Sequence, residues 1–204
     1  FDDNLSTFAD LVDASDLIPA LRAVKSPAEI VYVREAARLA DLAYEAAEEF
    51  TEVLRKRSKA AGFMKSLLLQ RICSSFASGR STAEKMRRRE LLDDEEAQIQ
   101  LEGILDGLTT EEAGFLDTII DELSRPEARD PKIAAVNYFL SEHRTDGKTW
   151  LEHGCIVFSQ YYDTARALAA NLAGSLSGEP IAIYAGAGKS GIHRDGDFAT
   201  VERE

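Results

Sequence analysis

Small and apolar residues recur along residues 36–54 at alternating steps of four and three. That spacing places them on one face of an α-helix, and small side chains there suit close packing against another helix. Ser26-Pro27-Ala28-Glu29 precedes the pattern and predicts the helix start, because Ser is a good N-cap, Pro suits the first turn and Glu completes a capping box. We expect this helix to end at Gly62. The residues of the face are Ala36, Ala40, Ala43, Ala47, Phe50 and Leu54.

Three further apolar stripes extend the helical prediction over the first 130 residues. The first of them is expected to stop near Gly79, and the last opens with the capping box Thr109-Thr110-Glu111-Glu112. Asp130-Pro131 then predicts another helix start, with Gly147 marking the turn after that helix. The stripes contain Met64, Leu68, Ile72 and Phe76; Leu91, Ile99, Leu101 and Ile104; and Phe115, Leu116, Ile119, Ile120 and Leu123.

Two short apolar runs, Gly154–Phe158 and Ile181–Tyr184, predict strands that are buried on both faces. The residues between them have helical spacing, with Asp163 as the expected cap. A strand, a helix and a strand within about 30 residues predict a right-handed parallel unit. The fold class is therefore α/β, with a mainly helical N-terminal part followed by an incomplete parallel β-α-β unit. The rest of its sheet is expected beyond Glu204 or in a partner.

We divide the chain into a helical N-terminal segment at 1–54, a helical arm at 55–129 and an α/β part at 130–204. The net charge of −12 is distributed unevenly among them. Residues 55–90 carry 11 basic and 2 acidic side chains, whereas residues 91–130 carry 2 basic and 13 acidic ones. Two interpretations stay open: the basic and acidic segments pair with each other, or the basic segment faces a polyanion.

Cysteine and histidine usage predicts neither a disulfide nor a metal site. Cys73 and Cys155 lie far apart in apolar runs without a CxxC motif, so we expect buried free thiols in a reducing compartment and a cytoplasmic location. The three histidines lack metal-ligand spacing. No apolar run approaches the roughly 20 residues of a membrane span, and the N-terminus has no signal-peptide pattern, so no membrane partner is expected.

The stretch from Tyr184 to Gly191, YAGAGKSG, contains the Gly-Lys-Ser of a nucleotide-binding loop. A P-loop needs a second glycine five residues before Gly188, and Ile183 occupies that position. The residues after Ser190 also make a poor first helical turn, so the dipole and amides of a helix N-terminus are not expected there. We predict that Lys189 is no nucleotide-phosphate lysine. A glycine loop at the end of a strand and a plain surface loop both remain possible.

Four short pieces resemble one family in order and spacing. They are Leu69–Ser74 (LQRICS), Asp130–Ile133 (DPKI), Gly154–Tyr161 (GCIVFSQY) and Tyr184–Gly186 with Val201–Glu204. Together they resemble the start of the second RecA-like domain of Swi/Snf-type superfamily-two DNA helicases and translocases, over about residues 58–204. The β-α-β unit would then be an incomplete RecA-like one.

The resemblance implies a fragment of an ATP-dependent DNA helicase or translocase. ATP and Mg²⁺ would bind the complete parent protein, whose first RecA-like domain would be a partner of this chain. The P-loop, the Asp-Glu box and the arginine-finger motif of the family are missing here, so the resemblance implies no catalytic residue, no cofactor bound by this chain alone and no ATPase activity alone.

DNA is the partner that the resemblance implies. Carried over by position, Ser159 and Gln160 would face the nucleic-acid backbone, while Gly186 and Ala187 would let the chain approach a phosphate closely. A capping or turn role is the alternative for the Ser-Gln pair. Basic residues of the 55–90 segment, among them Lys65 and Arg71, could line a duplex path.

Residues 9–48 carry a second resemblance. The string LRAVKSPAEI at 21–30 is similar to the linker segment of the creatinase and Xaa-Pro aminopeptidase, or pita-bread, family. The metal ligands of that family lie on later strands that have no counterpart here, so peptidase activity is not implied. Two hypotheses stand beside the helicase fragment. One is a non-enzymatic helical interaction module, in which the acidic segment covers the basic one, and the other is a remnant of a pita-bread metallopeptidase.

Overall fold

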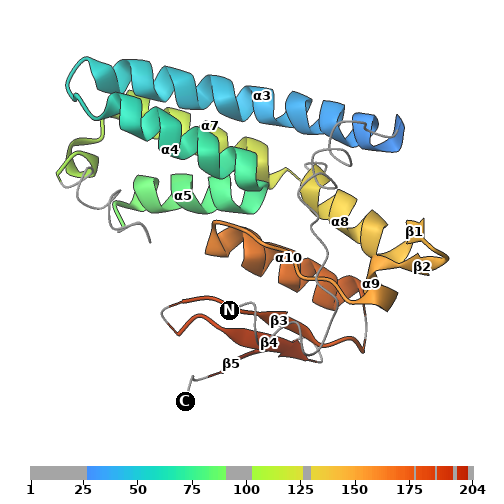
Figure 1. The fold of residues 1–204 in the computed structure, drawn as a ribbon. Coiled ribbons are helices and arrows are strands. Elements are labelled where there is room, and N and C mark those ends of the chain that lie inside the picture. The colour runs from blue at the N-terminus through green and yellow to red at the C-terminus, as the bar shows by residue number, and fades with distance from the viewer. Residues whose placement is uncertain are drawn as a thin grey trace, which may run out of the picture.

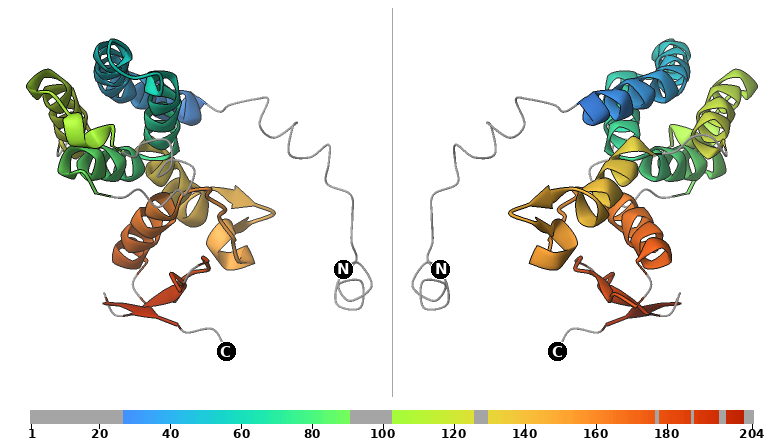
Figure 2. Two further views of the ribbon diagram at one scale, coloured as in Figure 1. Left: turned by 90° about the vertical axis from the view of Figure 1, so that its left-hand side faces the viewer. Right: turned by 90° about the vertical axis from the view of Figure 1, so that its right-hand side faces the viewer.

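The computed structural model describes residues 27–90, 103–125, 130–176, 178–186, 188–194 and 197–201. A helical bundle comes first, further helices follow beside it, and a small antiparallel sheet lies on the far side of those helices (Figure 1, Figure 2). The predicted cap at Ser26 and most of the stripe from Leu91 to Leu101 fall outside the described residues.

The long helix predicted from the small-residue face is α3 (Pro27–Arg55). Ala43, Ala47, Phe50 and Leu54 are fully buried where α3 packs on the neighbouring bundle helices α4 (Ala61–Ser74) and α7 (Thr110–Ser124).

The predicted end of this helix was wrong. The helix stops at Arg55, because the next two amides bond to carbonyls three residues back and tighten the turn. Gly62 instead lies in the first turn of α4, where a glycine costs only about 1 kcal/mol relative to Ala and packing outweighs it.

The second predicted stripe is buried but belongs to two helices. Met64, Leu68 and Ile72 lie on α4, whereas Phe76 begins α5 (Phe76–Arg88). The chain turns at Ser75, whose backbone is extended and whose hydroxyl accepts a hydrogen bond from the Ser78 amide at 3.1 Å. This cap explains why the stripe does not continue as one helix. Gly79 lies inside α5 rather than at a helix end.

The capping box at Thr109 is confirmed. Its hydroxyl accepts from the Glu112 amide at 3.2 Å, and the Glu112 carboxylate accepts from the Thr109 amide at 2.8 Å. A single turn of 3-10 helix, η1 (Leu105–Gly107), precedes α7. Leu116, Ile119 and Leu123 of α7 close the core of the bundle against α3 and α5.

Asp130 is the N-cap of α8 (Pro131–Ser141), as the sequence predicts. Its Oδ1 accepts from the amides of Lys132 at 2.9 Å and Ile133 at 3.3 Å, while its Oδ2 accepts from the Phe76 amide of α5 at 2.8 Å. One carboxylate therefore satisfies the N-termini of two helices.

A two-residue hairpin follows α8 and contains the predicted turn at Gly147. Its strands are β1 (Arg144–Thr145) and β2 (Lys148–Thr149), joined by Asp146 at φ 52° and Gly147 at φ 80°. Positive φ at both central residues is the geometry that favours an Asp-Gly pair in a tight hairpin. The short helix α9 (Trp150–His153) follows.

The predicted strand–helix–strand unit differs from the structure. Residues 154–158 run extended but form no strand, and they are exposed rather than buried: Ile156 is 80% and Phe158 89% exposed. The second predicted strand is present as β3 (Ile181–Ile183), which pairs antiparallel with β4 (Gly191–Arg194), and β4 pairs antiparallel with β5 (Asp197–Thr200). The described residues thus combine helices with small antiparallel sheets, and they contain no parallel pairing.

The helix between these segments is α10 (Tyr162–Ser175). Its N-cap is Tyr161, and Asp163 lies in the first turn instead of capping it as expected. Leu168, Ala169 and Leu172 are buried. Leu168 and Leu172 form a small apolar cluster with Leu140 of α8, against which Ile181 of β3 packs, and α10 also contacts α5 of the bundle.

Candidate nucleic-acid interface

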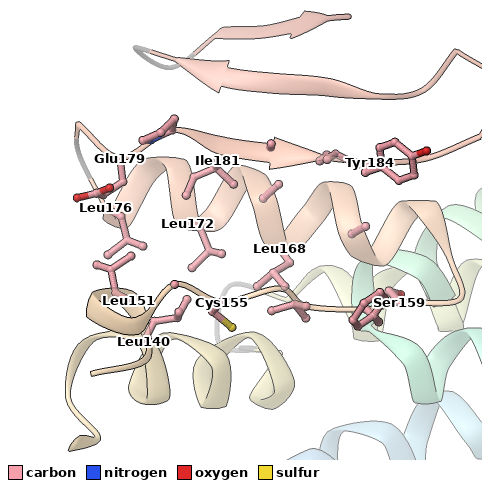
Figure 3. Close-up of a pocket in the computed structure, with 18 residues that line it drawn as sticks. Leu140, Leu151, Cys155, Ser159, Leu168, Leu172, Leu176, Glu179, Ile181 and Tyr184 are labelled. Atoms are coloured by element: carbon pink, nitrogen blue, oxygen red, sulfur yellow. The ribbon is translucent and has the colours of Figure 1, made fainter. Parts of the chain in front are cut away.

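An apolar groove of about 410 Å³ separates the extended segment 154–159 from β3. Figure 3 shows the two stretches on opposite sides of the groove, with Leu168 and Leu172 of α10 between them. Among the described residues, none forms a backbone hydrogen bond with residues 155–158. Residues 155–158 of this wall therefore have amides and carbonyls without a backbone partner among the described residues.

Ser159 and Gln160 end this extended segment, and both are exposed. The Ser159 hydroxyl folds back on the chain, accepting from the Tyr161 amide at 3.2 Å and donating to the Tyr161 carbonyl at 3.1 Å. That local turn corresponds to the alternative role we gave the Ser-Gln pair. It also leaves the Gln160 side chain at the surface, directly before α10.

Two consecutive tyrosines after Gln160 each have a cation over the ring. The Arg71 guanidinium of α4 lies 4.0 Å from the ring centroid of Tyr161, and the Lys189 ammonium lies 5.1 Å from that of Tyr162. Such contacts are attractive, because the ring face is electron-rich. They bring α4 and the loop after β3 to the same end of α10.

The loop after β3 is closed by the hydroxyl of Ser190, which is buried. This hydroxyl accepts from the Ala185 amide at 3.0 Å and donates to the Ala185 carbonyl at 2.8 Å. Gly188 has φ 70°, a conformation that favours glycine. β4 begins directly afterwards, so no helix N-terminus follows Gly-Lys-Ser, as the sequence predicts. The sequence motif is thus part of an antiparallel β-connection.

The predicted contact residues are only partly brought together. Gly186 lies in the loop that contacts Tyr162 and is exposed, with open space around its Cα, whereas Ala187 falls outside the described residues. Arg71 reaches the same region through Tyr161 but is only 7% exposed, so a phosphate contact would require its guanidinium to leave the ring. Lys65 belongs to a different surface, since its ammonium pairs with Glu48 of α3 at 2.7 Å.

Ion pairs between the basic and acidic segments account for part of the basic surface. Arg57 pairs with the buried Glu112 at 2.7 Å, and Arg87 pairs with Asp117 at 2.9 Å across α5 and α7. The first interpretation of the charge pattern, mutual pairing, therefore applies to these residues. Arg80 and Arg88 pair locally with Glu84 on α5 instead.

Sequence reasoning did not assign a role to Tyr161 and Tyr162 and removed Lys189 from consideration with the P-loop. The signal available in the sequence was the pair of tyrosines between the polar residues Ser159–Gln160 and the predicted helix. Their grouping with Lys189 depends on how the loop folds back, which the local sequence does not encode.

Both cysteines are free, and both are exposed, which corrects the expectation that they are buried. Cys73 lies on the exposed side of α4, whose Leu68 and Ile72 are buried, and Cys155 lies in the exposed 154–158 segment. The Tyr44 hydroxyl contacts the sulfur of Cys73, and burial is the first cause of a raised pKa of that tyrosine. Partial burial against the groove raises the pKa of the Cys155 thiol, so this thiol is less ionised than a free one at neutral pH.

Within the described ranges, no group of His, Cys, Asp and Glu side chains is placed to hold a metal ion. None of the described helices combines the length and apolar character needed to cross a bilayer. No family model, curated protein or solved structure matches the chain.

Proposed function

We propose that this chain is part of an ATP-dependent DNA translocase and supplies nucleic-acid backbone contacts from the start of its second RecA-like lobe. The observation that carries the proposal is the contact between Lys189 and the Tyr162 ring. It places a glycine-rich, cationic loop beside the exposed Ser159–Gln160 pair, although these stretches are separated in the sequence by the whole of α10.

Such a grouping suits a phosphate backbone. Hydroxyl, amide and ammonium groups, together with glycine amides, contact phosphates without reading base sequence. The lysine supplies the charge, while Ser159 and Gln160 supply polar contacts on the neighbouring surface.

The exposed apolar segment supports the same proposal. Ile156, Val157 and Phe158 have the β-branched and aromatic character of a buried strand, yet they are exposed and lack backbone partners within the described chain. In the complete lobe, further strands would pair with this segment and fill the groove against α10. The first RecA-like domain of the parent would supply the ATP and Mg²⁺ site, so this chain alone is expected to show no ATPase activity.

Fluorescence anisotropy with a duplex of arbitrary sequence tests the proposal. We expect binding at about 50 mM salt that weakens steeply as salt rises and is equal for unrelated sequences. Lys189→Gln should weaken binding uniformly and lower the salt slope by about one, because one phosphate contact is lost. Lys148→Gln, at the exposed β1–β2 hairpin, is the matched control and should leave both unchanged. No binding at about 50 mM salt, or binding insensitive to salt, would refute the proposal.

A non-enzymatic helical interaction module is the second candidate, favoured by the Arg57–Glu112 and Arg87–Asp117 pairs. Here the basic segment exists to hold the acidic helices. Reversing the charges of Arg87, Arg88 and Arg89 separates the two functions. If the variant loses DNA binding and keeps its melting temperature, the result supports the translocase fragment. If the parent protein does not bind DNA and the variant melts at a lower temperature, the result supports the module.

A further inference from the structure

The bend between α4 and α5 lies directly against the start of α10. We define the α4–α5 corner as residues 70–76, which include the end of α4, Ser75 and the first residue of α5. Ile72 within it is 2% exposed and belongs to the core of the bundle, as does Leu68 one turn earlier. The corner is therefore anchored in the larger of the two apolar clusters formed by the described residues.

Tyr161 is held by two adjacent residues of the corner. Its hydroxyl donates to Gln70 Oε1 at 3.2 Å, and its ring lies under the Arg71 guanidinium at 4.0 Å. A directional hydrogen bond and a ring contact together fix both the position and the tilt of the ring. Because Tyr161 is the N-cap of α10, the first helical amide–carbonyl bond, from Ala165 to Tyr161 at 3.2 Å, depends on where the corner holds it.

Thr164, in the first turn of α10, makes the second attachment. Its hydroxyl lies 2.8 Å from the hydroxyl of Ser74 and 2.8 Å from that of Ser75. Ser75 is 2% exposed and also caps α5, so the same side chain serves both helices. A hydroxyl that bridges two partners has a defined position, which an apolar side chain of the same shape would not keep.

We propose that Arg71, Gln70 and Thr164 are positioning residues, because they fix Tyr161 and the first turn of α10. They thereby also fix the position of Ser159–Gln160 and of the Lys189 loop relative to the helical bundle. The link to the loop passes through Tyr162, the neighbour of Tyr161, and its contact with Lys189. Arg71 thus acts on nucleic acid through Tyr161 rather than by meeting a phosphate itself, in agreement with its burial. The effect on nucleic acid rests on the proposed function; the effect on α10 does not.

Hydrogen exchange and DNA binding of three variants test the inference. Thr164→Val removes the bridging hydroxyl and keeps the side-chain shape, while Thr164→Ser keeps the hydroxyl and is the conservative control. Arg71→Met removes the charge over the Tyr161 ring. We expect exchange of the 165–168 amides, the first that are hydrogen-bonded within α10, to rise about tenfold in Thr164→Val and in Arg71→Met, since each loses a hydrogen bond or a cation–π contact. Exchange in α3 and α7 should stay unchanged, and Thr164→Ser should match the parent protein.

DNA affinity then reports the coupling. Both disruptive variants should weaken binding several-fold, with the salt slope unchanged, because the phosphate-contacting groups are present but less well placed. If exchange rises equally throughout the chain, the corner merely contributes to global stability and the inference is wrong. Unchanged exchange at 165–168 refutes it as well. Failure of the parent protein to bind DNA would refute the proposed function alone, since the exchange measurement would still decide whether the corner positions α10.

Discussion

The guanidinium of Arg57 donates to both carboxylate oxygens of Glu112, with Nε–Oε1 at 2.9 Å and Nη2–Oε2 at 2.7 Å. The Glu112 side chain is fully buried, whereas Arg57 retains 32% exposure. The same carboxylate accepts from the Thr109 amide in the capping box. A basic residue in the turn after α3 is thus tied to the first turn of α7.

Glu112→Gln should lower the free energy of unfolding by about 3 kcal/mol, because it leaves the partly buried guanidinium of Arg57 without its carboxylate partner. Urea denaturation followed by circular dichroism measures the change. Asp117→Asn is the matched control, since its pair with Arg87 is about half exposed on both sides and should contribute only about 0–1 kcal/mol. If both substitutions lowered the free energy of unfolding equally, burial of Glu112 would not explain the contribution of its ion pair.

The pH dependence of stability follows from the same pair. Burial acts to raise the pKa of Glu112, but the hydrogen bonds from Arg57 and Thr109 outweigh it and the net shift is downward. The unfolded chain therefore binds this proton more readily than the folded one, so the stabilisation is present above the unfolded pKa of about 4.3 and is lost as pH falls through the folded pKa. We expect the stability difference between the parent protein and Glu112→Gln to be constant above about pH 5.5 and to shrink below about pH 4. A difference that grows on acidification would contradict this.

Gly79→Ala should destabilise the bundle by about 1–3 kcal/mol, because an added methyl group cannot be accommodated without displacing its neighbours. A Cβ there would lie 2.8 Å from Ile72 Cγ1 and 3.0 Å from both Ile72 Cα and Leu123 Cδ1. Gly114→Ala in α7 is the control, since a Cβ there meets nothing within 4 Å. That variant should be neutral or gain up to about 1 kcal/mol from helix propensity. Thermal unfolding of both variants provides the comparison.

The exposed segment before α10 is expected to drive self-association. Uncharged, β-branched and aromatic residues with unpaired backbone groups form a template for pairing with another chain. Phe158→Ser and Ile156→Lys should therefore reduce light scattering at high protein concentration while changing the free energy of unfolding by less than about 0.5 kcal/mol. Leu172→Ala, in the buried face of α10 behind the same groove, should instead cost about 2–5 kcal/mol. Unchanged association in Phe158→Ser and Ile156→Lys would exclude the segment as the cause.

Helices were predictable where the sequence supplied both a periodic apolar face and a local cap. Thr109 and Asp130 fix helix starts through hydrogen bonds to amides two or three residues away, so their effect is visible in a short window. The end of α3 and the bend at Ser75 were missed, because the apolar stripe continues across the bend and only tertiary packing decides where one helix stops. Glycine was given too much weight at Gly62 and Gly79.

Strands and the candidate site were less accessible for a related reason. An apolar run such as 154–158 can become a strand only when another segment pairs with it, and pairing is not a property of the run itself. The sequence singled out Ser159, Gln160 and Gly186, but it could not show that Arg71 and Lys189 approach consecutive tyrosines beside them. Nor could it decide which basic residues are already matched by acidic ones.

The carboxylate of Asp130 has a consequence for how the molecule comes apart. One oxygen serves the first turn of α8 and the other serves the first amide of α5, so neither helix can lose its cap without disturbing the other. If α8 unfolds, α5 therefore loses a hydrogen bond at its N-terminus and the bundle is destabilised. Fraying of α5 in turn weakens the cap of α8. The two parts are joined at this side chain into one cooperative unit, which should melt in a single transition.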